Sequence, residues 1–199
     1  MKQLLNTSDS RDFQEARILD LYLPDDSHKK GVIIFIHGGN WQNGDKVQWQ
    51  EVAEYFCQNG FLTASINYRL APQWNLPAQI EDIRLAIAFV KKQAASLGFP
   101  PQKLTICGIT AGAYLALLSA VIQPNEYLGK SNELLDEKTH PKAVIAFSPI
   151  VSLMKDYHSI KINKLINELL SFDSSKEQAP FIKDCSPSER PEDFNCPLL

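Results

Sequence analysis

One short segment of this 199-residue chain carries residues whose types and spacing suit nucleophilic chemistry. It is GITAG, residues 108–112, placed between an apolar run expected as a strand, 103–107, and one expected as a helix, 113–122. A strand that turns sharply into a helix raises the central residue of such a segment to the end of the sheet, and the flanking glycines avoid clashes in the strained turn. Thr110 therefore occupies the position of an attacking nucleophile, where a serine is usual.

A second segment, HGGNW at residues 37–41, follows the apolar run 31–37. Backbone N–H groups at glycines in such a loop can approach a substrate closely and face an oxygen that becomes negative during acyl transfer. We expect His37, at the end of a buried strand, to hold this loop by hydrogen bonds rather than to act as a base. Trp41 is expected to pack in the core.

The elements that must position these two segments alternate along the chain. Strands are predicted at 16–24, 31–37, 61–68, 103–107 and 142–148, and helices at 48–59, 76–95 and 113–122, with a short helix as a candidate at 165–172. Continuous apolar strands alternating with amphipathic helices indicate an α/β fold: a mainly parallel central sheet with helices on both faces. The whole chain is expected to be one domain, incomplete at its C-terminus.

The end of the chain carries its own prediction. Residues 186–191 have the composition of a loop or turn, and residues 195–199 resemble the first residues of another strand. A sheet that stops there would leave the strand at 143–147 poorly covered. Because apolar sheet edges pair with other chains, self-association through this edge is a hypothesis.

Composition excludes several classes of protein. A net charge of −3 without a basic cluster gives no reason to expect binding to nucleic acid or to an anionic membrane. No signal-peptide or membrane-spanning stretch is seen, and the four cysteines lack CxxC spacing, so a cytoplasmic protein with reduced thiols is favoured over a disulfide framework. No metal-ligand spacing, G-x-G-x-x-G or P-loop occurs, so no cofactor is expected.

The two segments, together with INYRLAP at 66–72 and PAQIED at 77–82, resemble the α/β-hydrolase fold in its branch of H-G-G carboxylesterases. This branch includes hormone-sensitive-lipase-like, kynurenine-formamidase-like and feruloyl-esterase-like proteins, and the resemblance runs from around Glu15 to the end of the chain. It implies a small ester or amide substrate. It also implies site roles: Thr110 at the nucleophile position, an oxyanion hole from the N–H groups of Gly38, Gly39 and Ala111, and three scaffold residues, Tyr68, Arg69 and Asp82.

The chain departs from this family's pattern in two respects. The acid and the histidine of the family's triad follow later strands and cannot be carried over, and a hydroxyl without a base is a weak nucleophile. The elbow position requires a positive φ, which costs a β-branched residue on the order of 1–3 kcal/mol. Asp156 and His158 could form a replacement pair but fit a solvated loop better, and His140 and His28 are expected at the surface.

Three functional hypotheses remain open. The first is a protein of esterase ancestry with weak or absent hydrolase activity. The second is a non-catalytic protein that binds a small ester or carboxylate in the same site, or interacts with a partner. The third is a truncated gene product without a function of its own, whose signature would be low stability.

Overall fold

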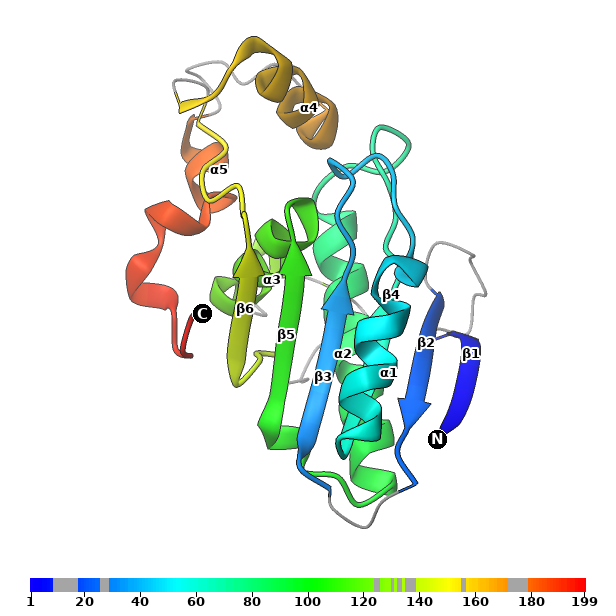
Figure 1. Ribbon diagram of the computed structural model, residues 1–199. Helices are drawn as coiled ribbons and strands as arrows, with labels where there is room; N and C mark the ends of the chain where they lie inside the picture. The colour runs from blue at the N-terminus through cyan, green and yellow to red at the C-terminus, as the bar shows by residue number, and fades with distance from the viewer. Residues whose placement is uncertain are drawn as a thin grey trace.

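The central feature of the fold is a six-stranded sheet with the strand order β1-β2-β4-β3-β5-β6 (Figure 1). The computed structural model describes residues 1–8, 18–25, 29–123, 126–129, 131, 134, 139–154, 157–171 and 179–199. Its strands are β1 Lys2–Ser8, β2 Ile18–Leu23, β3 Gly31–Ile36, β4 Phe61–Ile66, β5 Leu104–Ile109 and β6 Ala143–Phe147. The pairs β4–β3, β3–β5 and β5–β6 are parallel, whereas β1–β2 and β2–β4 are antiparallel.

Helices cover the sheet on both faces, as the sequence predicts. The helices are α1 Gln50–Gln58, α2 Ala78–Ser96, α3 Ala111–Val121, α4 Ile160–Leu170 and α5 Ala179–Asp184, with short 3-10 turns between them. In Figure 1, α1 lies in front of the sheet and α2 and α3 lie behind it. β3 runs through the middle of these layers, and every one of its residues is buried.

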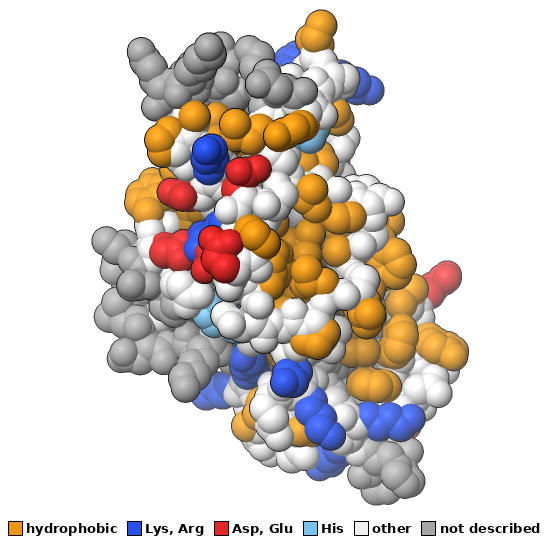
Figure 2. All heavy atoms as spheres, turned by 90° about the vertical axis from the view of Figure 1, so that its left-hand side faces the viewer, with side chains coloured by type: hydrophobic (Ala, Val, Ile, Leu, Met, Phe, Trp, Pro, Cys, Tyr) orange, Lys and Arg blue, Asp and Glu red, His pale blue; other side chains and the backbone are white. Residues whose placement is uncertain are grey.

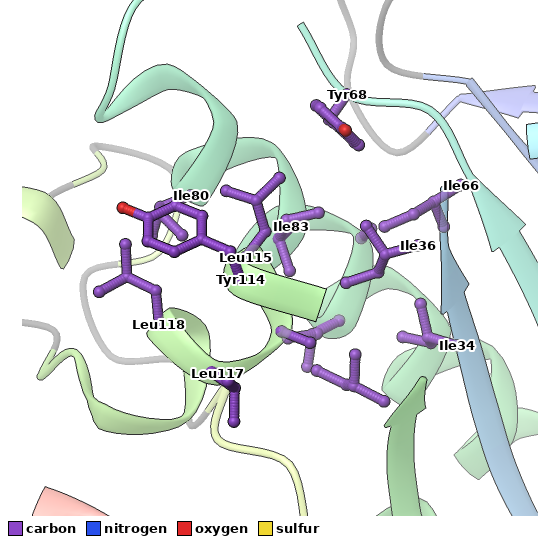
Figure 3. Close-up of a cluster of buried hydrophobic side chains, with 14 of the residues drawn as sticks. Ile34, Ile36, Ile66, Tyr68, Ile80, Ile83, Tyr114, Leu115, Leu117 and Leu118 are labelled. Atoms are coloured by element: carbon purple, nitrogen blue, oxygen red, sulfur yellow. The ribbon is translucent and has the colours of Figure 1, made fainter. Parts of the chain in front are cut away.

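The alternation of side chains along β3 divides the core into two parts. Ile34 and Ile36 point toward α2 and α3, where they pack with Ile83, Tyr114 and Leu115 in the larger apolar cluster (Figure 3). On the other face of the sheet, Phe35 packs under α1 in a smaller cluster that includes Cys57 and Cys107. This double burial explains why the β3 sequence is continuously apolar.

The structure differs from the prediction at both ends of the chain. β1 was not predicted; it pairs with β2. The alternating pattern at 16–24 is typical of an edge or an antiparallel strand, and β2 is antiparallel to both of its neighbours, β1 and β4. The candidate helix at 165–172 is α4, which begins earlier because the Ser159 side chain accepts a hydrogen bond from the Ile162 N–H. Residues 16, 17 and 172 lie outside the described residues.

The last residues extend the sheet by a short parallel bridge. Leu198 pairs with Val144, and the Ala146 N–H donates to the Leu199 carbonyl over 2.9 Å. This confirms the strand opening predicted at 195–199. Large apolar side chains stay exposed at the ends of the neighbouring strands: Phe147 is 52% exposed and Ile109 38% exposed. Figure 2, which faces the β6 side of the sheet, shows hydrophobic side chains gathered across the middle of this face. Self-association through this region stays a prediction.

Candidate functional site

The site begins with the glycine loop that follows β3. Gly39, Asn40 and Trp41 have φ values of 116°, 56° and 62°, so three consecutive residues occupy the left-handed region of backbone space. Gly39 is required there, because an added Cβ would lie 1.9 Å from the Asn43 carbonyl oxygen. The Trp41 side chain is fully buried and meets the Tyr114 ring edge-on, with ring centroids 5.4 Å apart. Trp41 therefore packs in the core as predicted, and it fixes the loop to α3.

His37 holds the base of this loop, as the sequence predicts. Its Nδ1 lies 2.7 Å from the Gly38 carbonyl oxygen; since a carbonyl only accepts, Nδ1 is the donor. The ring stacks on Tyr68 with centroids 4.3 Å apart, and the Tyr68 hydroxyl donates to the His37 carbonyl over 3.2 Å. Burial lowers the pKa of His37, while the Gly38 carbonyl and the nearby Asp45 act in the opposite direction. The buried, neutral imidazole therefore stabilises the loop through its hydrogen bond to Gly38 and its stacking on Tyr68.

The turn at residues 108–112 has the strained geometry expected of an elbow. Thr110 has φ 50° and ψ −111°, and α3 begins at the next residue, Ala111. Neither glycine tolerates a side chain. A Cβ on Gly108 would lie 2.4 Å from the Gly112 carbonyl oxygen, and a Cβ on Gly112 would lie 2.4 Å from the carbonyl oxygens of His37 and the preceding residue. β5 therefore passes directly into α3 through a turn in which both glycines are required, and the role of Thr110 as a nucleophile stays a prediction.

The structure brings the glycine loop and the elbow together at the carboxyl ends of β3 and β5. A Cβ built on Gly38 would lie 2.5 Å from the Thr110 Oγ1 and 3.0 Å from the Ile109 carbonyl oxygen. Ala111, next to Thr110 in the chain, is the first residue of α3, and the first N–H groups of a helix have no partner within it. Thr110 is itself held to the sheet, because its N–H donates to the Phe147 carbonyl over 2.9 Å.

Two of the three residues predicted as scaffold, Arg69 and Asp82, form a buried ion pair. The Asp82 carboxylate accepts from both the N–H and the side chain of Arg69, with an Nη2–Oδ1 distance of 2.7 Å. The same guanidinium contacts Glu81 over 2.7 Å and donates to the Ala78 carbonyl. Burial alone would lower the pKa of Arg69, but these two carboxylates raise it overall. The network ties the segment after β4 to the start of α2.

A second buried network is not signalled by the sequence. Lys46 and Asp20 form an ion pair of 2.8 Å, and both side chains are only 7% exposed. Asn67 accepts from the Lys46 N–H, and its amide donates to Asp45, the residue that caps the 3-10 turn Lys46–Trp49. Burial raises the pKa of Asp45, but hydrogen bonds from Val47 and the Asn67 side chain lower it overall. These partners come from distant parts of the chain, so no local pattern indicates them.

The other two described histidines, His140 and His158, hydrogen-bond to backbone carbonyls and not to the Thr110 hydroxyl. His158 is half-buried, and its Nε2 donates to the Ser152 carbonyl over 2.6 Å. His140 was expected at the surface, which is wrong: it is half-buried, with Nε2 3.0 Å from the Ile122 carbonyl, and burial lowers its pKa. His28 and Asp156 lie outside the described residues, so the suggested pair of Asp156 and His158 is untested.

Metal-site and membrane-span signals are both missing from the described residues. Among them, no group of three or more His, Cys, Asp or Glu side chains is placed to hold a metal ion. In the same part of the chain, none of the helices combines the length and the apolar character needed to cross a bilayer. The four cysteines, all described, are free thiols.

Comparison with known proteins finds sequence relatives that are named as esterases. Esterase LipQ of Mycobacterium tuberculosis is 38% identical over 91 residues, which are 45% of this chain and 22% of that protein. A probable isoprenylcysteine alpha-carbonyl methylesterase of Oryza sativa is 34% identical over 120 residues, 60% of this chain and 28% of the relative. The chain thus spans about a quarter of the length of these curated relatives.

A solved structure shows the same fold. Esterase B from Lactobacillus Rhamnosis superposes with a TM-score of 0.79 at 23% identity, covering 99% of this chain and 64% of that one. The family model BD-FAE matches residues 19–197, which is most of the chain. By this match the chain belongs to BD-FAE, an esterase family of the α/β-hydrolase fold, and the relatives and the solved structure that it resembles are named as esterases.

Proposed function

We propose that the site at Thr110 recognises the acyl group of a small carboxylic ester or amide. One observation carries this proposal: the Thr110 hydroxyl and the Gly38 backbone lie so close that a single added Cβ would meet Oγ1 at 2.5 Å. A hydroxyl beside a glycine loop and a helix N-terminus supplies two of the parts used in acyl transfer, a nucleophile position and N–H donors for the carbonyl oxygen. The esterase names of the relatives support the same class of substrate.

The proposed chemistry places the substrate carbonyl between these groups. Its oxygen would accept from the N–H groups of Gly38, Gly39 and Ala111, while its carbon faces the Thr110 hydroxyl. Such donors stabilise the negative charge that develops on the oxygen, and removal of one donor costs about 10²–10³-fold in turnover in a serine hydrolase. The loop is fixed by His37 and Trp41, so the donors need little rearrangement.

We further propose that hydrolysis at this site is weak or absent. In the described part of the chain, no histidine is hydrogen-bonded to Thr110, and those with bonds use backbone carbonyls. Without a base, a hydroxyl remains protonated and attacks slowly. Loss of triad members typically leaves turnover lower by about 10⁴-fold or more, with only oxyanion stabilisation and binding remaining. The threonine methyl adds bulk close to the reacting carbon.

A hydrolysis assay on the purified 199-residue protein tests the proposed inactivity. With p-nitrophenyl acetate and butyrate we expect turnover near the background rate, unchanged in Thr110→Ala. Thr110→Ser serves as the matched variant that removes only the methyl group. Turnover well above background that disappears in Thr110→Ala would contradict the proposed inactivity and establish Thr110 as a nucleophile.

The same site supports a second candidate function: binding without turnover. The observation that favours it is a preformed loop of N–H donors next to a hydroxyl that has no bonded base among the described residues. Titration with butyrate, followed by the amide signals of Gly38 and Gly39, would then show saturable binding. If neither butyrate nor the esters bind, and no turnover occurs, acyl recognition at this site is refuted.

A further inference from the structure

Two Asn-Gly pairs occur in this chain, at residues 43–44 and 59–60, and each of them follows a glutamine. An Asn-Gly pair can react within itself, because the glycine nitrogen and the side-chain carbonyl carbon of the asparagine close a five-membered ring. Glycine favours this closure, since it has no side chain to hinder the nitrogen and its backbone is the least restricted. The structure places the two pairs in different surroundings, so their reactivity can be compared within one molecule.

The first pair lies in the connection between β3 and α1, directly after the glycine loop (Figure 1). Asn43 and Gly44 are both exposed. In the part of the chain that the structure describes, neither the Asn43 side-chain amide nor the Gly44 N–H takes part in a hydrogen bond. Ring closure at this pair therefore breaks no hydrogen bond of the side-chain amide or of the attacking nitrogen.

The second pair is fixed at the end of α1. The Asn59 side-chain amide donates to the Tyr55 carbonyl over 2.8 Å, and the Gly60 N–H donates to the Cys57 carbonyl over 3.0 Å. Gly60 is also buried, whereas Gly44 is exposed. Ring closure at Asn59 must break both hydrogen bonds, and the loss of each raises the barrier to reaction.

The backbone of the first pair packs against the group that anchors the glycine loop. A Cβ built on Gly44 would lie 2.3 Å from the Gly38 carbonyl oxygen and 2.4 Å from the His37 Nδ1, the two atoms that their hydrogen bond joins. The Asn43 carbonyl oxygen would in turn lie 1.9 Å from a Cβ on Gly39. A main chain lengthened between Asn43 and Gly44 would therefore have to displace one of these contacts.

We propose that the pair Asn43–Gly44 is a site of spontaneous deamidation and isomerisation that alters the glycine loop. The Gly44 nitrogen forms a bond to the Asn43 Cγ, the Cγ–Nδ2 bond breaks, and Nδ2 leaves as ammonia with the proton of the Gly44 N–H. Water then opens the cyclic imide at one of its two carbonyl groups. One product is aspartate with the original main chain, and the other is isoaspartate, in which the side-chain methylene has entered the main chain.

The two products affect the loop in different ways. Both carry a carboxylate that is ionised at neutral pH, so a negative charge appears beside the glycine loop. Isoaspartate also lengthens the main chain before Gly44, which displaces Gly44 from the His37 ring and the Gly38 carbonyl. This modification goes beyond the proposed acyl site at Thr110 and does not depend on turnover there.

The two pairs are compared in the purified 199-residue protein, incubated at mildly alkaline pH, where the attacking nitrogen loses its proton more readily. Proteolysis followed by mass spectrometry measures aspartate and isoaspartate at Asn43 and at Asn59. In the folded protein we expect the reaction at Asn43 to be at least about 5-fold faster, because only Asn59 must break two hydrogen bonds. In concentrated urea both pairs are unfolded, and we expect the two rates to agree within about 2-fold. Equal rates in the folded protein, or the same ratio of rates in urea as in buffer, would overturn the proposal.

Matched variants test the effect on the loop. Asn43→Gln keeps the amide but requires a larger ring and so reacts slowly, and Asn59→Gln makes the same change at the second pair. The amide signals of Gly38 and Gly39 are followed by nuclear magnetic resonance as each protein ages. We expect a second set of signals to grow in the parent and in Asn59→Gln, at the rate of modification measured by mass, and to be missing in Asn43→Gln.

The parent protein alone decides the point if Asn43→Gln does not fold, because its new signals must grow at the same rate as its modified fraction. Gly38 and Gly39 signals that stay unchanged in the modified protein, or that change equally in aged Asn43→Gln, would overturn the proposed effect on the loop.

Discussion

The close approach of Gly38 to Thr110 predicts the cost of one added methyl group. In Gly38→Ala the new Cβ would lie 2.5 Å from the Thr110 Oγ1 and 3.0 Å from the Ile109 carbonyl oxygen. Both are shorter than van der Waals contact. The carbonyl belongs to β5, which is paired on both sides and cannot retreat. Overpacking of this kind costs typically 1–3 kcal/mol, and we expect about 2 kcal/mol for this variant.

A double-mutant cycle separates the two contacts. Thr110→Ala removes Oγ1, so Gly38→Ala should cost at least about 1 kcal/mol less in that background. Thr110→Val is the matched control, because it keeps two heavy atoms on Cβ and therefore the clash. The free energy of unfolding is measured by urea titration with tryptophan fluorescence. A cost below about 0.5 kcal/mol for Gly38→Ala, or equal costs in the Ala and Val backgrounds, would refute the proximity of loop and elbow.

Two further predictions concern the residues around the site. Asp82→Asn should lower the free energy of unfolding by about 3 kcal/mol, the low end for a broken buried pair, because Glu81 still contacts Arg69. Glu81→Gln, at a side chain 27% exposed, should cost about 1 kcal/mol or less; equal costs would contradict the argument. The folded-state pKa of His37 lies below its ordinary 6.5, so its contribution to stability is present above pH 6.5 and is lost as pH falls through the lowered value. Urea titrations between pH 7 and 5 should therefore show a smaller decline in His37→Gln than in the parent, and parallel declines would contradict the burial of a neutral ring.

The elements that hold the site could be predicted because their signals are local. β3 is buried on both faces, so its sequence is continuously apolar, and β5 is mostly buried and mostly apolar. Glycines mark the places where backbones nearly touch. Gly108 and Gly112 are needed because a Cβ at either position would clash with neighbouring backbone atoms. Since the required residue types lie next to each other in the chain, the amino-acid sequence is sufficient to predict the turn and the positive φ at its centre.

The features that could not be predicted from the sequence depend on contacts between residues that are distant in the chain. The ion pair of Lys46 with Asp20 joins segments that share no pattern, and each residue alone resembles a solvated charge. The surface position expected for His140 is wrong because its ring bonds to a residue distant in sequence, the Ile122 carbonyl just after α3. β1 was missed because most of its residues are exposed and only its pairing with β2 orders it. In each of these cases the position of the residue depends on its partners in the folded chain, which its residue type does not indicate.

The left-handed run of Gly39, Asn40 and Trp41 has a consequence for the thermodynamics of any ligand that reaches the loop. The backbone freedom of these residues is already lost in the folded protein, since the Trp41 side chain is enclosed in the core. Binding therefore carries little further conformational entropy cost at the loop, which is the advantage of preorganisation. The affinity of such a ligand would then be limited by the water it must displace from the amides rather than by the ordering of the chain.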